Sequence, residues 1–229
     1  MTLIVKNTTL IGPFDLIAPH TCRCCGRTGE VLCIRCKKYI NTSIFNKCPN
    51  CKADKSSPKC PKCLDFPPCF IVGPREDLLA TLIHDFKYYS IRAIGVKLAE
   101  LMADRLPDFP DNTFIVPLPT ATHHIRERGF DHTYYVAKRI AKLKHVKVAR
   151  LFVRTKNTVQ VGADKTTREL QAEQAFMVKD DAHIDPSATY ILFDDVWTTG
   201  ASMKTAVKKL RETGAKKNVI ALLATSSLD

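Results

Sequence analysis

Long apolar runs and a secretory leader are both missing from this sequence. No stretch approaches the roughly 18 consecutive apolar residues that a membrane-spanning helix needs. The opening residues, MTLIVKNTTLIGPFDLIAPH, have no basic start, no long apolar centre and no small-residue cleavage pattern. We therefore expect a cytoplasmic protein without membrane insertion.

The remaining composition is ordinary for a globular protein. The 229 residues are 45% hydrophobic and 25% charged, which allows a sizeable core. This length exceeds the commonest single-domain size, so we expect a main domain and a small accessory module. The formal net charge is +12, and the stretch 120–168 alone has 12 Lys and Arg against 3 Asp and Glu. Such a basic block implies an anionic partner.

Eight of the ten cysteines form four CxxC pairs within residues 22–63. Two thiolates at this spacing can close on one ion, and without a secretion signal metal binding explains the pairs better than disulfides. A region this small cannot fold on apolar burial alone, so the metal would supply folding free energy. We expect structural Zn²⁺ in two four-cysteine sites, with the ligands Cys22, Cys25, Cys33, Cys36, Cys48, Cys51, Cys60 and Cys63.

The spacing leaves the pairing of these cysteines open. Adjacent pairs could share a metal, or alternate pairs could do so. A single metal and an iron–sulfur cluster are further alternatives, and Cys24 and Cys69 are free thiols or alternative ligands.

We divide the chain into a zinc-binding module, 1–73, and a main domain, 74–229, because a Pro- and Gly-containing segment follows the last cysteine pair. Apolar residues then alternate between helical spacing and short strand-like runs. This alternation predicts an α/β fold with a mostly parallel sheet flanked by helices. The expected helices are 78–86, 94–102, 133–143 and one from about Ser202 to Gly214, and the expected strands are 113–118, 146–153, 190–193 and 218–224.

The segment that follows the strand at 190–193 carries the strongest functional signal. Asp194 and Asp195 come first, and together they can accept hydrogen bonds from two neighbouring hydroxyls of a ribose. A turn of small and hydroxyl-bearing residues follows, whose backbone N–H groups can surround a phosphate at the start of a helix. The turn consists of Thr198, Thr199, Gly200, Ala201 and Ser202. A helix cap without a ligand is the structural alternative.

The run ILFDDVWTTGAS resembles the phosphoribosyl-pyrophosphate (PRPP) motif of type I phosphoribosyltransferases. Together with the cysteine pairs, HDFKY and FIVPLPTATHHIRERGFDHT, it makes nearly the whole chain from Cys22 resemble the ComF/ComFC family of competence-associated phosphoribosyltransferase-like proteins. The resemblance implies a type I phosphoribosyltransferase-like domain with a small double zinc-ribbon-like module. Asp131-His132 departs from the Asn-Gln that is frequent in the family, and Asp131 would weaken the positive field there.

By this resemblance, Pro119 and Thr120 belong to the pyrophosphate loop, and 155–168 is a flexible loop over the substrate. The catalytic candidates are Arg126, Arg128 and Arg168, which would stabilise the departing negative charge. Solvated loop charges are the alternative for Arg126 and Arg128. We interpret Lys87 as a surface lysine and His123-His124 as loop residues.

The expected activity is Mg²⁺-dependent transfer of the phosphoribosyl group from PRPP to an unknown acceptor, in connection with DNA uptake and natural transformation. The alternative is a non-catalytic, PRPP-responsive protein that binds single-stranded DNA and contacts the DNA-uptake machinery. The cysteine module interleaves its basic residues with few aromatics, so a base-stacking platform is not evident there. A purely structural zinc protein would leave the acidic pair and its turn unexplained.

Overall fold

The computed structural model describes residues 20–42, 45–155 and 175–226. At its centre is a parallel sheet with the strand order β3-β2-β6-β7-β1. Leu118 N donates to Phe193 O at 2.9 Å, which extends the contact between β2 and β6 beyond the end of β2. The strands are β1 (Cys69–Pro74), β2 (Thr113–Pro117), β3 (Lys147–Val148), β6 (Thr189–Trp197) and β7 (Lys217–Thr225).

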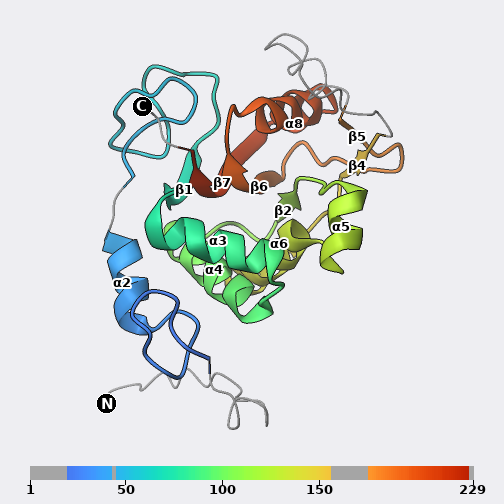
Figure 1. Ribbon diagram of the computed structural model, residues 1–229. Helices are drawn as coiled ribbons and strands as arrows, with labels where there is room; N and C mark the ends of the chain where they lie inside the picture. Colours follow the sequence, from blue (N-terminus) through green and yellow to red (C-terminus); the bar gives the residue numbers. More distant parts are fainter. Residues whose placement is uncertain (1–19, 43–44, 156–174, 227–229) are drawn as a thin grey trace, which may run out of the picture.

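Helices cover both faces of this sheet (Figure 1). One face carries α3 (Asp77–Tyr88), α4 (Arg92–Arg105) and α6 (His132–Leu143), and the other carries α8 (Ala201–Glu212). Because successive side chains of a strand point to opposite faces, Ile191 and Phe193 pack with α4 and α6, whereas Tyr190 and Leu192 pack with α8. Burial on both faces explains why the strands read as near-continuous apolar runs.

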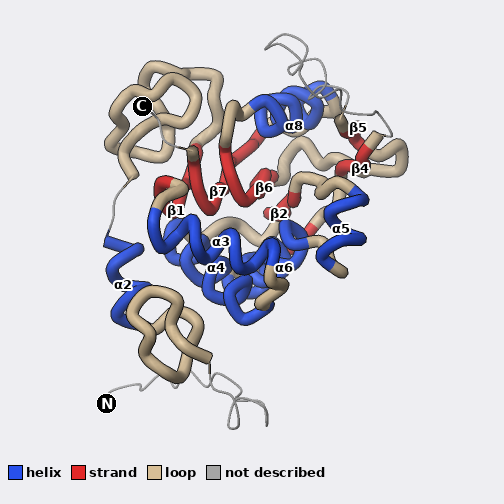
Figure 2. The backbone as a smooth tube through the Cα atoms, viewed as in Figure 1, coloured by secondary structure: helices blue, strands red, loops and turns tan. Residues whose placement is uncertain are grey.

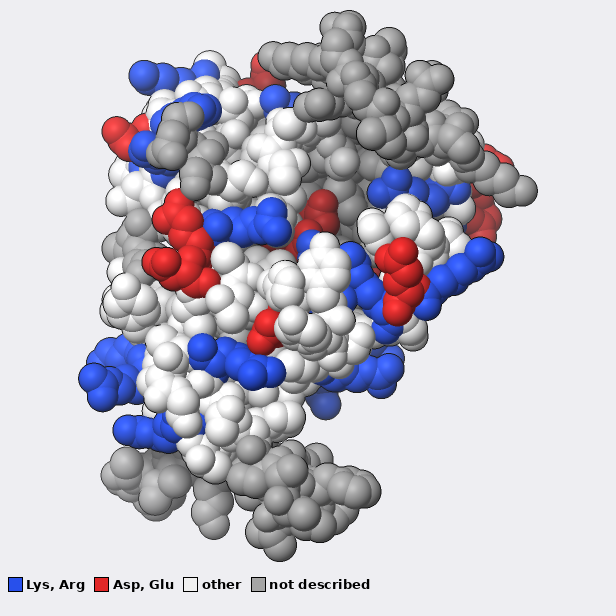
Figure 3. All heavy atoms as spheres, viewed as in Figure 1, with Lys and Arg blue, Asp and Glu red and all other residues white. Residues whose placement is uncertain are grey.

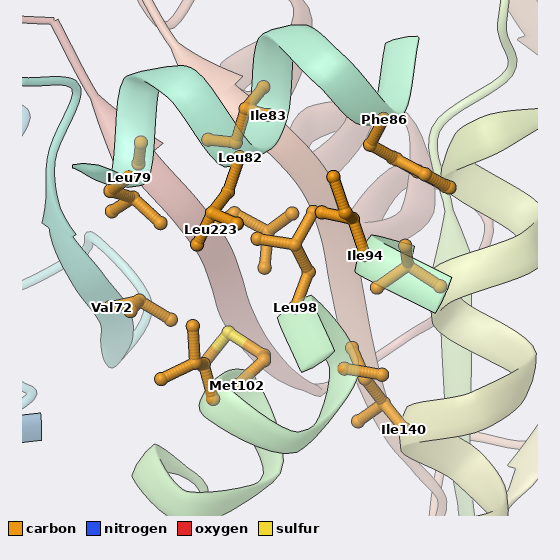
Figure 4. Packing of buried hydrophobic residues seen from close by; sticks show 14 of the residues in the cluster. Val72, Leu79, Leu82, Ile83, Phe86, Ile94, Leu98, Met102, Ile140 and Leu223 are labelled. Atoms are coloured by element: carbon orange, nitrogen blue, oxygen red, sulfur yellow. The ribbon is translucent and has the colours of Figure 1, made fainter. Parts of the chain in front are cut away.

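Figure 4 shows the larger of the two cores, where α3 and α4 meet the sheet. Leu82, Leu98 and Leu223 are each at most 1% exposed. Burying one such side chain contributes about 2 kcal/mol. The periodicity that predicted these helices therefore marks the residues that hold them on the sheet.

The predicted fold class is confirmed, and most predicted elements are present as α3, α4, α6, α8, β2, β6 and β7. The single strand predicted at 146–153 is wrong. It divides into β3 and β4 (Phe152–Arg154), and β4 pairs antiparallel with β5 (Phe176–Val178) outside the main sheet. The chain leaves the sheet after Ala149, and Phe152 turns instead into the core beneath α8. The short helix α5 (Thr122–Arg128) forms where a loop was expected.

The cysteine-rich region forms two separate bodies, both built mostly from loops (Figure 2). The first includes α2 (Ile34–Thr42) and lies against α4, where Lys37 Nζ is 3.2 Å from Glu100 Oε2. The second lies on the opposite side of the sheet, where Arg211 Nη2 of α8 donates to Asp65 O at 2.8 Å. The two bodies therefore contact different faces of the main domain.

Residues 69–73 form most of β1, which pairs with β7 at the edge of the main sheet. The division of the chain at residue 73 stays a prediction. None of the described helices is long and apolar enough to cross a membrane.

Candidate functional site

The direction in which successive strands are added to the sheet reverses between β2 and β6. From β2 it continues to β3 on one side of the sheet, and from β6 it continues to β7 on the other. In open α/β sheets, ligands bind at the carboxyl ends of the strands where the order reverses in this way. A cavity of about 350 Å³ lies there. Its lining includes Arg75, Lys87, Tyr88, Pro119, Thr120, Arg128, His132, Arg154, Asp194, Asp195, Thr198 and Ser202.

Asp194 and Asp195 bring two carboxylates to the last part of β6. Asp195 Oδ2 accepts a hydrogen bond from His132 Nε2 at 2.8 Å and is paired with the ammonium of Lys87. Burial opposes ionisation of Asp195, but the hydrogen bond from His132 and the charge of Lys87 outweigh it and hold the pKa of this carboxyl below its usual range. Burial and then the charge of Asp195 raise the pKa of Asp194 to about 7. The pKa values of the two neighbouring carboxyls are therefore shifted in opposite directions.

The turn after β6 contains Gly200, which adopts a left-handed conformation with φ +76° and forms the N-cap of α8. A Cβ at this position would collide with the ring of Trp197, so any residue other than glycine would force the ring to move. Ala201 N donates to Thr199 Oγ1 at 3.4 Å. A hollow of about 50 Å³ lies inside the turn, lined by Thr198, Thr199, Gly200, Ala201 and Ser202 among others. Its position at the start of a helix suits an anion.

Across the cavity, Pro119 and Thr120 follow β2. Pro119 O accepts from Arg154 Nε at 3.1 Å, and Thr120 Oγ1 donates to Asp131 Oδ1 at 2.9 Å. The same Asp131 oxygen accepts from Tyr134 N at 3.0 Å, which caps α6. Arg150 Nη2 lies 3.5 Å from the other oxygen. The carboxylate of Asp131 is thus held by partners within the protein, and one of them, Arg150, carries the opposite charge. The expectation that Asp131 weakens the positive field near an anion stays a prediction.

All of the predicted catalytic and substrate-binding residues meet at this cavity and the adjoining turn, with two exceptions. Arg126 is exposed and does not line the cavity, whereas Arg128 does. Arg168 lies outside the described residues, as does most of the loop predicted at 155–168.

The sequence interpretation missed several residues of the site. Lys87, interpreted as a surface lysine, is half-buried and paired with Asp195. His132, Arg154 and Arg75 also line the cavity. These four residues lie on α3, on α6, on β4 and in the connection between β1 and α3, so no local pattern connects them. With Arg128, the cavity has four cationic side chains beside two carboxylates. Figure 3 shows that on this face Lys and Arg form separate groups, with acidic side chains between some of them.

The eight predicted metal ligands form two groups, and adjacent CxxC pairs share each group. Within each group the four Sγ atoms lie within 4.8 Å of one another. Cys25 and Cys33 are 3.7 Å apart at Sγ, and Cys51 and Cys60 are 3.6 Å apart. Tetrahedral coordination with Zn–S bonds of about 2.3 Å separates the sulfurs by roughly 3.8 Å, so both groups could hold Zn²⁺.

Backbone donors favour the thiolate form of Cys22 in the first group. Burial opposes ionisation of Cys22, yet hydrogen bonds from backbone N–H groups, among them that of Cys33 at 3.4 Å, lower the pKa of its thiol to about 6. In the second group Asn50 Nδ2 donates to Cys63 Sγ at 3.4 Å, but burial outweighs this hydrogen bond and raises the pKa of the Cys63 thiol to about 12. Cys24 and Cys69 belong to neither group, and burial raises the pKa of Cys69 to about 12.

The second cysteine-rich body contacts the turn after β6 through two aromatic rings. Phe66 lies just beyond Cys63, and its ring meets the ring of Trp197 edge-on with 5.7 Å between the centroids. Trp197 in turn packs against Gly200. The second cysteine-rich body and the turn after β6 are therefore in direct contact.

This strand order, together with a candidate site at the point where it reverses, defines an open α/β domain. Similar solved structures include an allosteric regulatory enzyme of purine biosynthesis, at 13% identity and a TM-score of 0.42 over 60% of this chain and 29% of that one. Another is adenine phosphoribosyl transferase from Trypanosoma brucei, at 12% identity and a TM-score of 0.38 over 61% of this chain and 67% of that one.

Two relatives are similar to this chain in sequence, and both are competence proteins. Competence protein ComFC of Bacillus subtilis is 30% identical over 112 residues, which are 48% of this chain and 44% of that protein. Competence protein F of Haemophilus influenzae is 26% identical over 81% of this chain and 86% of that protein. No family model matches the chain. The expected resemblance to the ComF/ComFC family is confirmed by these relatives.

Proposed function

We propose that this protein binds PRPP with Mg²⁺ and transfers its phosphoribosyl group to an acceptor, in connection with DNA uptake. The observation that carries the proposal is the pair Asp194-Asp195 directly before a glycine-opened turn at a helix start, in a cavity with four cationic side chains. The competence proteins among its relatives support the connection with DNA uptake.

In this proposal the turn Thr198–Ser202 holds the 5-phosphate. The first backbone N–H groups of α8 have no partner within the helix, so they can donate to phosphate oxygens. Asp194 and Asp195 accept hydrogen bonds from the 2- and 3-hydroxyls of the ribose. The low pKa of Asp195 favours this role because an ionised carboxylate is a pure acceptor.

The pyrophosphate would lie near Pro119 and Thr120, within reach of Arg128. The bond between C1 and the pyrophosphate oxygen breaks, and its electron pair leaves with the pyrophosphate. The acceptor's lone pair forms the new bond to C1, and the acceptor loses its proton. Arg128 stabilises the departing charge, and we extend the same role to Arg168 and, less directly, to the exposed Arg126. Positioning and charge stabilisation would supply the catalysis, without a covalent intermediate on the protein.

Mg²⁺ would arrive on the substrate. Among the described residues, the groups suited to holding a metal are the two cysteine groups, and none lies at the cavity. Oxygen atoms of the pyrophosphate and the ribose hydroxyls are suitable ligands for Mg²⁺. Within this proposal the protein's task is to orient the PRPP that carries the metal.

We also propose that both cysteine groups hold structural Zn²⁺. Four thiolate ligands are typical of structural sites, in which no coordination position is left open for a substrate. Metal analysis of the purified protein should give two zinc ions per chain, and Cys25→Ser should reduce this to one. Two zinc ions in Cys25→Ser would contradict the assignment.

The decisive test is calorimetric titration of PRPP, with and without Mg²⁺, into the wild type and an Asp194→Asn/Asp195→Asn variant. We expect Mg²⁺-dependent binding that the variant loses. A zinc-loaded, folded wild type that does not bind PRPP would overturn the proposal. Binding without turnover in a screen of acceptors would favour the non-catalytic, PRPP-responsive alternative.

A further inference from the structure

His132, at the start of α6, is 6% exposed and uses both ring nitrogens. Nε2 is 2.8 Å from Asp195 Oδ2, and Nδ1 is 3.0 Å from Arg128 Nη1. We propose that His132 is a positioning residue, which fixes the ribose-binding carboxylate and the pyrophosphate-facing guanidinium relative to each other. This inference rests on the proposed function, since it assigns these two partners to PRPP.

The chemistry of the partners determines where the ring carries its proton. A guanidinium has N–H donors and no acceptor, so Nδ1 must accept the hydrogen bond from Arg128. The neutral ring then has its proton on Nε2 and donates it to Asp195 Oδ2. His132 thus acts as a neutral connector between a cation and an anion, with a defined tautomer.

Arg128 needs such a connector because α5 is weakly anchored. This helix has seven residues and buries none of them. The guanidinium of Arg128 is 5.3 Å from the centroid of the Tyr88 ring, and Tyr88 is itself 62% exposed. The hydrogen bond to the buried ring of His132 is therefore the contact that connects Arg128 to the interior of the domain.

Asp195 is also oriented by this contact. Both His132 and Lys87 approach the same oxygen, Oδ2, from α6 and α3. Within the described parts of the chain, Oδ1 makes no hydrogen bond, so it remains an acceptor for a ligand hydroxyl. A side chain that cannot donate at position 132 would leave Lys87 as the remaining contact that orients Oδ2 within the described parts of the chain.

Glutamine offers a conservative replacement. Its amide carries one acceptor and one donor, as the neutral imidazole does, on a side chain of similar reach. Asparagine carries the same groups on a shorter side chain, and leucine fills the space without either group. The three variants therefore separate hydrogen bonding from the filling of volume.

The test is calorimetric titration of Mg·PRPP into the wild type, His132→Gln, His132→Asn and His132→Leu, with thermal unfolding of each. We expect His132→Gln to bind within about threefold of the wild type and His132→Leu to bind at least about tenfold more weakly, because two charged partners lose their hydrogen bonds to the ring. His132→Asn should resemble His132→Leu.

A second measurement does not depend on ligand or variants. Long-range ¹⁵N–¹H spectra of labelled wild type should show the His132 proton on Nε2 and none on Nδ1. A proton on Nδ1, or His132→Leu binding as tightly as the wild type, overturns the inference. A wild type that does not bind Mg·PRPP overturns the proposed function and the inference with it, so the two failures are distinguishable.

Discussion

The ring of Trp197 occupies the space that a side chain at residue 200 would need. The backbone at Gly200 also has φ +76°, a conformation that side chains other than glycine rarely adopt. Two separate constraints, one steric and one conformational, therefore require glycine in the turn that precedes α8. The shape of this turn depends on the position of the indole.

A Gly200→Ala substitution tests this relationship. We expect it to lower the free energy of unfolding by about 2 to 5 kcal/mol, because left-handed strain and overpacking add together. Gly129→Ala is the matched control, since Gly129 has φ +73° and nothing within 4 Å of its missing Cβ. Gly129→Ala should lower the free energy of unfolding by about 1 to 2 kcal/mol. Equal losses for the two variants in urea denaturation would contradict the role of Trp197.

Loss of metal from the second cysteine group should change the environment of Trp197. Trp197 is the single tryptophan of the chain, so its fluorescence reports this position alone. We expect a Cys48→Ser/Cys51→Ser variant to shift the emission to longer wavelength, because Phe66 no longer holds the ring. The Cys22→Ser/Cys25→Ser variant alters the group on the other face and should leave the emission unchanged. Identical spectra for both variants would argue against the contact through Phe66.

The raised pKa of Asp194 predicts a pH-dependent stability. The folded-state pKa of about 7 exceeds the ordinary value of 3.8, so the folded protein binds more protons between these values and its stability falls as pH rises through that window. Asp194→Asn removes this penalty and should unfold at a higher temperature than the wild type at pH 8, with a smaller difference at pH 4. Asp195→Asn should instead be less stable at pH 8, because it loses its charge pairing with Lys87. The same direction of change for both variants would contradict the opposite pKa shifts.

Two arginines of the same short helix should differ in their effect on PRPP. Arg128 lines the cavity and contacts His132, whereas Arg126 is exposed away from it. We expect Arg128→Ala to weaken Mg·PRPP binding about tenfold or more, since hydrogen bonds to charged groups contribute about 1.5 to 3 kcal/mol. Arg126→Ala should change it less than about twofold. Comparable losses in calorimetry would indicate a general effect of positive charge rather than a specific contact.

Local patterns in the sequence predicted most of the fold, because strands and helices of this type are defined by apolar periodicity. The helix at 78–86 and the strand at 113–118 are examples, since each carries its core-facing residues in an unbroken pattern. The prediction of one strand at 146–153 failed because β propensity does not determine which partner strand a segment pairs with. Phe152 packs against Phe176, a residue from a segment that gave no signal of its own.

The part of the candidate site that lies within one contiguous motif could be predicted from the sequence. The segment from Asp194 to Ser202 is contiguous, so its acids and its turn could be identified together. Lys87 and His132 reach Asp195 from α3 and α6, and only the folded chain brings them there. The sequence singled out His132 as a departure from a frequent Asn-Gln pair, without indicating that its ring would face an aspartate.

The pairing of β1 with β7 has a consequence for the order in which the protein is made. Cys69 pairs with Ile220, so the edge of the sheet can close only after the ribosome has added nearly all of the residues between them. Contacts this distant in sequence form slowly. The ligands of each cysteine group, by contrast, are local in sequence. Metal capture can therefore order the second cysteine-rich body in the nascent chain while the surfaces that this body will contact, α8 and the turn at Trp197, have yet to be translated.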